Sequence, residues 1–436
     1  MKVIDRRDFL KLMGLAGLSL AAPWPTSLAR AQSTQPYDGP LFFTFAASGG
    51  WDPTVFCDPK ENQPGEREIN RWSRAQDTQT IAGSPITYAP FANNQQFFER
   101  FHTDMLVVNG VDAETNSHDA GTRNNWSGRI DPGYPAFAAI AANIYGDNLP
   151  LPFLTNGGYR ETAGLATYTE VNSTRALQDL VDVNRVPRRD RVYYEEDELA
   201  IIEQTMQDRL GARANRNGVL PRERRTIENV AFARANRQQL EALTLGLPDQ
   251  LVNPIDQNGN RNGLLQQAQV GLICCDAGLT VACDLETGGF DTHGDHDNNH
   301  TTALQRLTNG ITYLWDTAEQ MGLADRLVVL ISSDFGRTPR YNDGNGKDHW
   351  PIGSAVLMKQ GAPWANRVVG LTDGGHSAIS INPDTLAADS SASGVRLRPA
   401  HVHDAFRRVA GVADHEVARR FRLDAERVDF FADPAT

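Results

Sequence analysis

One stretch of the chain is the strongest indication of its fold class. It reads Leu279-Thr280-Val281-Ala282-Cys283-Asp284-Leu285 and is followed by Gly288-Gly289-Phe290-Asp291-Thr292-His293. Its first part is a short apolar run, typical of a strand buried on both faces of a sheet. Two glycines then permit a tight turn, and Asp291 and His293 follow directly. In α/β proteins ligands bind just beyond the carboxyl ends of such strands. The stretch therefore predicts a strand that delivers two metal-ligand side chains to one edge of a sheet.

Four more apolar runs have the same character and are bounded by Gly, Asp or Ser. They are Leu41 to Phe45, Met105 to Val108, Leu327 to Ile331 and Ser354 to Met358. Segments with helical spacing of apolar residues lie between them, such as Thr302 to Gln320. Strands that alternate with helices predict a layered α/β fold. We expect a three-layer sandwich with a mainly parallel sheet at its centre.

The character of the chain changes between about residues 171 and 260, where charged and amide side chains are dense. Leu199, Ile202, Met206 and Leu210 mark one amphipathic helix, and a second follows Pro221. This segment is predicted to be a helical insertion in one α/β domain that spans residues 32–436.

Residues 1–31 have the pattern of a twin-arginine export signal. Arg6-Arg7-Asp8-Phe9-Leu10-Lys11 precedes an apolar run from Leu12 to Ala22, and Ala29-Arg30-Ala31 offers a cleavage site. The apolar run is shorter than the roughly 20 residues that span a bilayer. We expect export by the twin-arginine machinery to the periplasm or the extracellular space, with no membrane segment in the mature chain.

The net charge of the chain bears on which kinds of partner it can bind. The whole chain carries 42 Lys and Arg against 54 Asp and Glu, a formal charge of -12. Residues 1–31 contain five cationic and two acidic side chains, so the mature chain carries -15. Nucleic acid as a partner is excluded on this basis, because phosphate contacts need clustered Lys and Arg. The four cysteines match no zinc-binding spacing and are interpreted as small buried residues, although a disulfide that involves Cys283 stays open.

Two other predicted strands also end near a carboxylate. Leu41 to Phe45 leads through Gly49-Gly50 to Asp52, and Leu327 to Ile331 leads to Asp334. Three strands thus deliver a carboxylate each to one edge, and His293 and His349 are close by in the sequence. Mixed Asp and His ligation predicts a divalent metal. Zinc is favoured by the imidazoles, and manganese, calcium and magnesium are compatible.

Three motifs carry a family resemblance. Gly288 to His293, the block Ser333-Asp334-Phe335-Gly336-Arg337-Thr338-Pro339, and Asp348-His349-Trp350 resemble the bacterial domain-of-unknown-function 1501 family. That family is usually exported by the twin-arginine route and is regarded as related to the alkaline phosphatase and sulfatase superfamily. The resemblance covers most of the mature chain apart from the insertion, and it implies an alkaline phosphatase-like fold.

The resemblance also implies two metals beside a Ser or Thr nucleophile. Asp291, His293 and His349 would hold the first metal, and Asp52 and Asp334 the second. Ser117 would be the nucleophile, at the N-cap position of a predicted helix from His118 to Trp126. A helix N-terminus and a metal both favour its alkoxide.

Several alternatives stay open. The superfamily usually has His directly after the fourth carboxylate, where this chain has Phe335. A single-metal site, or a second site completed by His118, is compatible with this difference. Arg337 either clamps a substrate oxyanion or holds its loop against a carboxylate. Ser117 has the alternative role of a helix cap, and His118 that of a donor to a loop carbonyl.

Two further His residues, His296 and His300, are predicted to be solvated. The predicted function is an exported metal-dependent hydrolase of phosphate or sulfate esters, with a small anionic ester as substrate. The alternative is a non-catalytic exported binding or assembly protein that retains the superfamily fold.

Overall fold

The computed structural model describes residues 37–170, 191–214 and 250–431, together with a few single residues between 184 and 248. The predicted export signal at residues 1–31 and the predicted helix after Pro221 lie outside the described residues. Within the described ranges no helix combines the length and the apolar character that crossing a membrane requires.

The core is one sheet of eight strands in the order β12-β4-β11-β8-β1-β7-β5-β6. β11 runs antiparallel to both of its neighbours, and all other neighbouring strands are parallel. The strands are β1 (Leu41–Ala47), β4 (Met105–Asp112), β5 (Phe153–Thr155), β6 (Tyr168–Thr169), β7 (Ala282–Thr287), β8 (Leu327–Ser333), β11 (Ile352–Met358) and β12 (Arg367–Val369). The predicted mainly parallel α/β sheet is confirmed, with an antiparallel β11 and three short strands that the apolar runs did not indicate.

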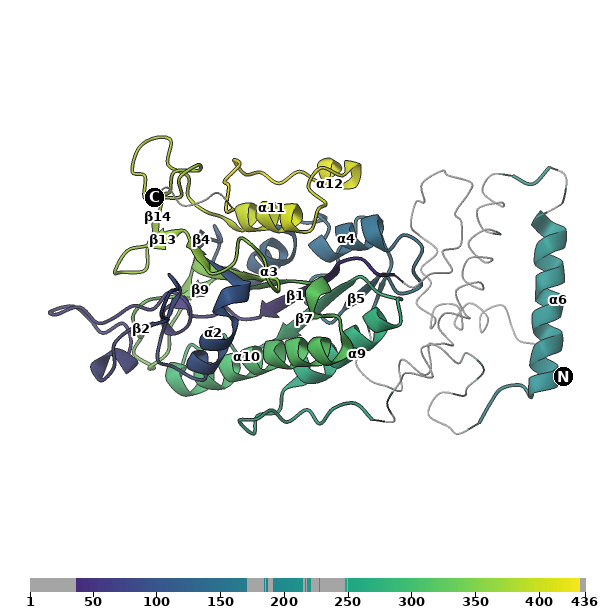
Figure 1. Ribbon diagram of the computed structural model, residues 1–436, viewed down its shortest axis with the longest axis horizontal. Coiled ribbons are helices and arrows are strands. Elements are labelled where there is room, and N and C mark those ends of the chain that lie inside the picture. The colour runs from purple at the N-terminus through teal and green to yellow at the C-terminus, as the bar shows by residue number, and fades with distance from the viewer. Residues whose placement is uncertain are drawn as a thin grey trace.

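Helices cover both faces of the sheet, as Figure 1 shows. Side chains alternate along β1, so that Phe43 and Phe45 pack into one apolar cluster and Phe42 into the other. The first cluster contains α2 (Asn94–Phe101), α9 (Gly263–Asp276) and α10 (His296–Met321), and the second contains α4 (Phe137–Tyr145) and α11 (Pro399–Val409). The three-layer arrangement is therefore confirmed.

Smaller elements complete the described chain. The helices are α3 (His118–Ser127), α6 (Glu196–Ala214), α12 (Glu416–Arg420) and the 3₁₀ turns η1 (Pro53–Val55), η2 (Trp72–Arg74), η3 (His102–Asp104) and η4 (Ala324–Arg326). Three two-stranded ribbons pair β2 (Gln79–Thr80) with β3 (Thr87–Tyr88), β9 (Gly336–Arg337) with β10 (His349–Trp350), and β13 (Leu371–Thr372) with β14 (Ala378–Ile379). The ribbon of β9 and β10 brings Arg337 opposite His349.

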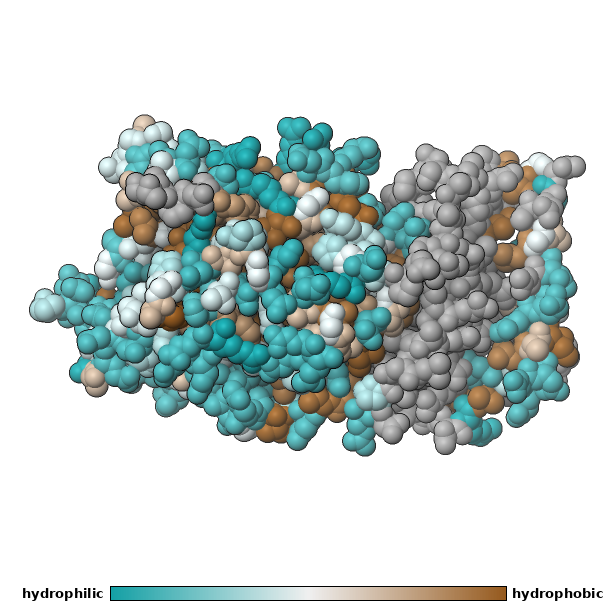
Figure 2. All heavy atoms as spheres, viewed as in Figure 1, coloured by the Kyte–Doolittle hydropathy of each residue, from teal (hydrophilic) through white to brown (hydrophobic). Residues whose placement is uncertain are grey.

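The helix α6 lies where the sequence predicts a helix with Leu199 and Leu210 on one face. Leu199, Ile202, Met206 and Leu210 are half-buried, whereas Ile201 on another side of the helix is exposed. Figure 1 places α6 apart from the helices that cover the sheet. Figure 2 shows a largely hydrophilic face over the sheet-bearing part of the molecule, in keeping with the acidic composition.

All four cysteines are buried and free. Cys274 and Cys275 lie on α9 and Cys283 on β7, while Cys57 follows η1. Their interpretation as small buried residues is confirmed, because each packs into the first apolar cluster.

His403 on α11 is buried, and its Nε2 donates to the carbonyl of Asn125 at 2.9 Å. Burial lowers the pKa of this imidazole to about 4. Since the unfolded value is near 6.5, the unfolded chain binds the proton more readily, and stability falls as pH drops from about 6.5 towards 4. We expect about 3 kcal/mol of stability to be lost over this window because of His403.

Urea unfolding of the parent and a His403→Gln variant at several pH values checks this expectation. The glutamine amide keeps a donor for Asn125 but does not titrate. The variant should therefore lose less stability than the parent on acidification. Equal losses in both proteins would contradict the assignment.

Candidate metal centre

Four strand ends meet at one edge of the sheet. Ala47 of β1 is in register with Thr287 of β7 and with Ser333 of β8, so these three parallel strands end at the same level. Both β4 and β8 are antiparallel to β11, so β4 points in the same direction as the other three. The segments that follow these strands carry the residues predicted from the sequence.

One carboxylate oxygen lies at the centre of the cluster. Asp291 Oδ1 is 3.0 Å from His293 Nε2, 3.2 Å from His349 Nε2 and 3.6 Å from His118 Nε2. The two Nε2 atoms of His293 and His349 are themselves 3.0 Å apart. The structure thus brings together Asp291, His293 and His349, as predicted, and adds His118.

Each of these imidazoles is held from behind through its Nδ1. His118 Nδ1 lies 2.5 Å from Asp334 Oδ2, His293 Nδ1 lies 2.8 Å from Asp348 Oδ1, and His349 Nδ1 lies 2.8 Å from the carbonyl oxygen of Asn116. All three partners are acceptors, so Nδ1 carries the proton and a neutral ring points its Nε2 lone pair inward. Histidines that bind metal ions have this arrangement of outer partners.

The inward-facing imidazole atoms crowd one oxygen. With each Nδ1 protonated, three Nε2 lone pairs lie within 3.6 Å of Asp291 Oδ1, and a cation among them would relieve their mutual repulsion. The distances of 3.0, 3.0 and 3.2 Å among His293, His349 and Asp291 are close to the edge of about 3.3 Å expected for tetrahedral zinc ligands. His118, Asp291 and His349 form the one metal-ligating group found among the described residues. His293 lies outside this group but next to it, 3.0 Å from both Asp291 Oδ1 and His349 Nε2. These side chains fit a divalent ion.

Arg337 is fully buried and holds Asp291 in place. Its Nε donates to the carbonyl of Gly50 at 2.9 Å and its Nη1 to that of Lys347 at 3.0 Å. Its Nη2 donates to the carbonyl of Gly49 and to Asp291 Oδ1, the latter at 2.6 Å. Burial opposes ionisation of Asp291, but Arg337, His349 and His293 together outweigh it and hold the pKa of the carboxyl at about 2. The geometry therefore matches the role in which Arg337 holds its loop against a carboxylate.

Asp334 has a different set of partners from those of a metal ligand. Its Oδ1 accepts hydrogen bonds from the backbone N–H groups of Gly49 and Gly50 at 3.0 and 2.6 Å. Both glycines have positive φ, and a Cβ at Gly50 would lie 2.8 Å from the ring of Phe335. The other oxygen binds His118, and this hydrogen bond raises the pKa of that imidazole. Asp334 thus orients a candidate ligand.

Asp52 lies outside the cluster. Its carboxylate is fully buried, 2.6 Å from Lys347 Nζ and 3.1 Å from His296 Nε2, and its other oxygen caps η1 by accepting from Thr54. Burial opposes ionisation, but the charge of Lys347 lowers the pKa of Asp52 well below its usual range. The structure therefore does not bring Asp52 together with Asp291.

The prediction that His296 and His300 are solvated is wrong. Both rings are fully buried on α10, and His300 Nε2 accepts the backbone N–H of Asp52 at 2.9 Å. Thr292 joins the two rings through its hydroxyl, at 2.7 Å from His296 Nδ1 and 3.3 Å from His300 Nδ1. Burial lowers the pKa of both imidazoles. The prediction was based on the polar residues around these two histidines. In the structure both rings lie on the side of α10 that faces the buried carboxylate of Asp52.

Ser117 is at the N-cap position of α3, as predicted, but its side chain makes no capping hydrogen bond. The residue is exposed, and Asn116 beside it is the outer partner of His349. Phe335 is buried, with ring centroids 4.8 Å from His118 and 4.6 Å from His349. The segment 116–118 thus places a hydroxyl next in sequence to a candidate ligand.

Gly346 lies against the backbone of His293. A Cβ at position 346 would be 1.9 Å from the carbonyl oxygen of His293, whereas at Gly344 the nearest atom would be 3.4 Å away. We expect Gly346→Ala to cost roughly 2 kcal/mol or more and to weaken metal binding, because the backbone of His293 must move. Gly344→Ala is the matched control, and denaturant unfolding with zinc titration of both variants checks the expectation. Equal behaviour of the two would contradict it.

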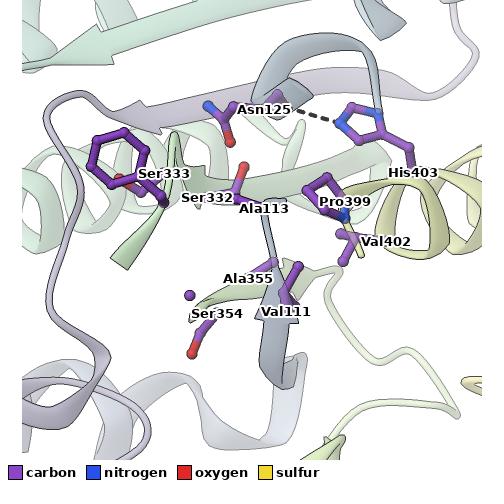
Figure 3. Close-up of a pocket in the computed structure, with 12 residues that line it drawn as sticks. Val111, Ala113, Asn125, Ser332, Ser333, Ser354, Ala355, Pro399, Val402 and His403 are labelled. Carbon is purple, nitrogen blue, oxygen red and sulfur yellow. Dashed lines mark hydrogen bonds between the residues drawn. The ribbon is translucent and has the colours of Figure 1, made fainter. Parts of the chain in front are cut away.

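Figure 3 shows a small cavity near the end of β8. It is lined by Ser332 and Ser333 of β8, by Ser354 of β11, and by Val402 and His403 of α11. Its volume of about 20 Å³ is far below the roughly 300 Å³ of a small-molecule site. The candidate centre is instead the exposed cluster, in which Asp291 is 47% exposed.

A family model described as a protein of unknown function, DUF1501, matches residues 48–389. The chain belongs to the DUF1501 family. The matched range contains every one of the candidate ligands and their outer partners. A search of curated proteins finds no significant match.

The chain is also distantly similar to several solved structures. A sulfatase from Pseudoalteromonas sp. has 9% identity and a TM-score of 0.40, with 91% of this chain and 72% of that chain covered. Alkaline phosphatase from the Antarctic bacterium TAB5 has 10% identity and a TM-score of 0.33, with 76% and 95% covered. A protein in the alkaline phosphatase superfamily from Vibrio parahaemolyticus has 8% identity and a TM-score of 0.33, with 85% and 73% covered. The side chains of this DUF1501 protein themselves support a metal centre.

Proposed function

We propose that this DUF1501 protein is an exported metal-dependent hydrolase of phosphate or sulfate esters. The observation that supports the proposal is the convergence of three Nε2 atoms, from His118, His293 and His349, on Asp291 Oδ1. Imidazole-rich ligation with one carboxylate favours zinc, and manganese, calcium and magnesium stay compatible.

The roles of the residues follow from their positions. A bound ion would lower the pKa of a hydroxyl or water and neutralise charge on the departing oxygen. Ser117, exposed at the N-terminus of the ten-residue helix α3, is the proposed nucleophile. Arg337 keeps Asp291 ionised and fixed, and Asp334 and Asp348 keep His118 and His293 in the tautomer that binds metal.

Hydrolysis of aryl phosphate and aryl sulfate esters by the zinc-loaded mature protein tests the proposal. Ser117→Ala should lower kcat by at least about 100-fold, because the nucleophile is lost while the ligands stay in place. Ser390→Ala, at another exposed serine, should leave the rate unchanged. If Ser117→Ala retains the parent rate, Ser117 is not the nucleophile. If neither ester is hydrolysed, the hydrolase proposal fails.

The second candidate function is a non-catalytic exported binding or assembly protein. One observation favours it: every nitrogen of the Arg337 guanidinium donates within the protein, so this cation is not available to a substrate oxyanion. Binding of phosphate or sulfate to the zinc-loaded protein without turnover would support this function. Rapid turnover of either ester would exclude it.

Export is part of the proposal and depends on residues 1–31. The sequence pattern supports cleavage after Ala31 and delivery to the periplasm or the medium by the twin-arginine machinery. N-terminal sequencing of the protein from a periplasmic fraction tests this step. Retention of the intact chain in the cytoplasm would contradict it.

A further inference from the structure

The groups that would hold a second metal ion are already used within the protein. We infer that the centre holds one divalent ion, bound by His118, His293, His349 and Asp291, and that no second ion binds beside it. This inference rests on the proposed metal centre. It corrects the expectation from family resemblance that Asp52 and Asp334 hold a second metal.

Asp334 has little capacity left for a metal. Its Oδ1 accepts from Gly49 N and Gly50 N, and these two donors use both lone pairs of that oxygen. The whole side chain is only 3% exposed. A metal at this oxygen would have to displace two backbone donors that fix the turn after β1.

The other oxygen of Asp334 is too close to His118 to share an ion with it. Two ligands that are each about 2.1 Å from one ion lie roughly 3.0 to 3.4 Å apart at ordinary coordination angles. The separation of Asp334 Oδ2 and His118 Nδ1 is 2.5 Å, which is below that range and is a direct hydrogen-bond contact. Nδ1 of His118 therefore donates to Asp334, and Nε2 is the atom left for the ion.

Asp52 is neutralised by a cation of the protein itself. Lys347 Nζ has three hydrogen-bond partners, at 2.6 Å from Asp52, 2.9 Å from Asn70 and 3.2 Å from Thr54. Both side chains of this ion pair are fully buried, whereas Asp291, which pairs with Arg337, is 47% exposed and faces water. A divalent ion at Asp52 would bring a second cation beside this buried ammonium group, which is strongly unfavourable at low dielectric.

Phe335 packs against two of the histidines of the cluster. Its ring packs against His118 and His349 and offers no ligand atom. The ring also contacts Arg337 and lies beside Gly50, where even a Cβ would meet it at 2.8 Å. The position after Asp334 thus supports the two rings from one side instead of binding metal.

Counting zinc in the mature protein tests the inference. The protein is stripped with a chelator, reloaded with zinc alone, freed of excess and assayed by elemental analysis, with affinity measured by calorimetric titration. One ion per chain in a single binding event is expected. Two ions per chain would overturn the inference while leaving the metal centre intact, and no bound ion would overturn the metal centre itself.

Two variants distinguish ligands from outer partners. Asp334→Asn and the exposed Asp348→Asn should each keep one ion with an affinity lowered about 10- to 100-fold, because the ligand histidines lose their orientation. Asp343→Asn, at an exposed carboxylate in the same loop as Asp348, should bind as the parent does. A complete loss of the ion in the Asp334 variant, with the Asp348 variant still binding, would make Asp334 a ligand and overturn the inference.

Discussion

Asp291→Asn is expected to remove bound zinc from the protein and to abolish ester hydrolysis. Asp291 Oδ1 lies within 3.6 Å of all three inward-facing imidazole nitrogens. An asparagine keeps the shape but loses the negative charge that offsets a divalent ion. Loss of an outer partner lowers metal affinity by at most about 100-fold. Loss of Asp291 itself should lower the zinc affinity by more than that.

The measurement is zinc titration of the metal-free variant, with elemental analysis of the purified protein. Asp343→Asn is the control, because Asp343 is exposed in a neighbouring loop. Far-ultraviolet circular dichroism establishes that the variant is folded. Parent-like zinc binding by a folded Asp291→Asn protein would contradict the ligand set.

Lys347→Met is expected to cause the largest loss of stability, on the order of 3 to 5 kcal/mol. The substitution leaves the carboxylate of Asp52 buried without its cation, while Thr54 and Asn70 each lose a donor. Lys347 also precedes Asp348 and His349, and its backbone N–H donates to the carbonyl of Thr292 at 3.0 Å. Zinc affinity should fall together with stability.

Denaturant unfolding of Lys347→Met and of Asp52→Asn/Lys347→Met checks this expectation. The double variant should recover part of the loss, because removing both charges leaves no unpaired ion. Lys359→Met is the control, since Lys359 makes no ion pair within the described part of the chain. A loss below 1 kcal/mol in the single variant would show that the pair does not stabilise the fold.

The sequence predicted the sheet well where strands are buried on both faces. The runs that begin at Leu41, Met105 and Leu327 correspond to β1, β4 and β8, because continuous apolar stretches are the pattern of such strands. The same pattern carries no information on direction, so the antiparallel course of β11 was not evident. Strands of two or three residues, such as β6 and β12, are too short to leave a periodic signal.

The candidate ligands Asp291, His293 and His349 were found because each follows a strand or a turn at the edge where the sheet ends. The same reasoning did not show that His118 faces the ion while Asp334 orients it. The backbone N–H groups of Gly49 and Gly50, in the turn after β1, donate to Asp334 and determine this arrangement.

The role of Asp52, which is buried, could not be predicted from the sequence either. A carboxylate after a strand and a glycine pair has the position of a ligand, and the sequence contains no sign that Lys347 folds onto it from almost 300 residues away. The Asp-Pro-Thr sequence at Asp52 does indicate its observed local role, because Asp before Pro is a common start of a helical turn. The outer partners Asp348 and Asn116 were missed, although Asp348 directly precedes a predicted ligand.

X-ray absorption spectroscopy of the zinc-loaded mature protein identifies the ligands of the bound ion. We expect one zinc environment with three imidazole nitrogens and one carboxylate oxygen at about 2.0 to 2.2 Å, and no second zinc in the outer scattering. A shell of oxygens without imidazole, a sulfur ligand, or a zinc–zinc vector near 4 Å would contradict this expectation.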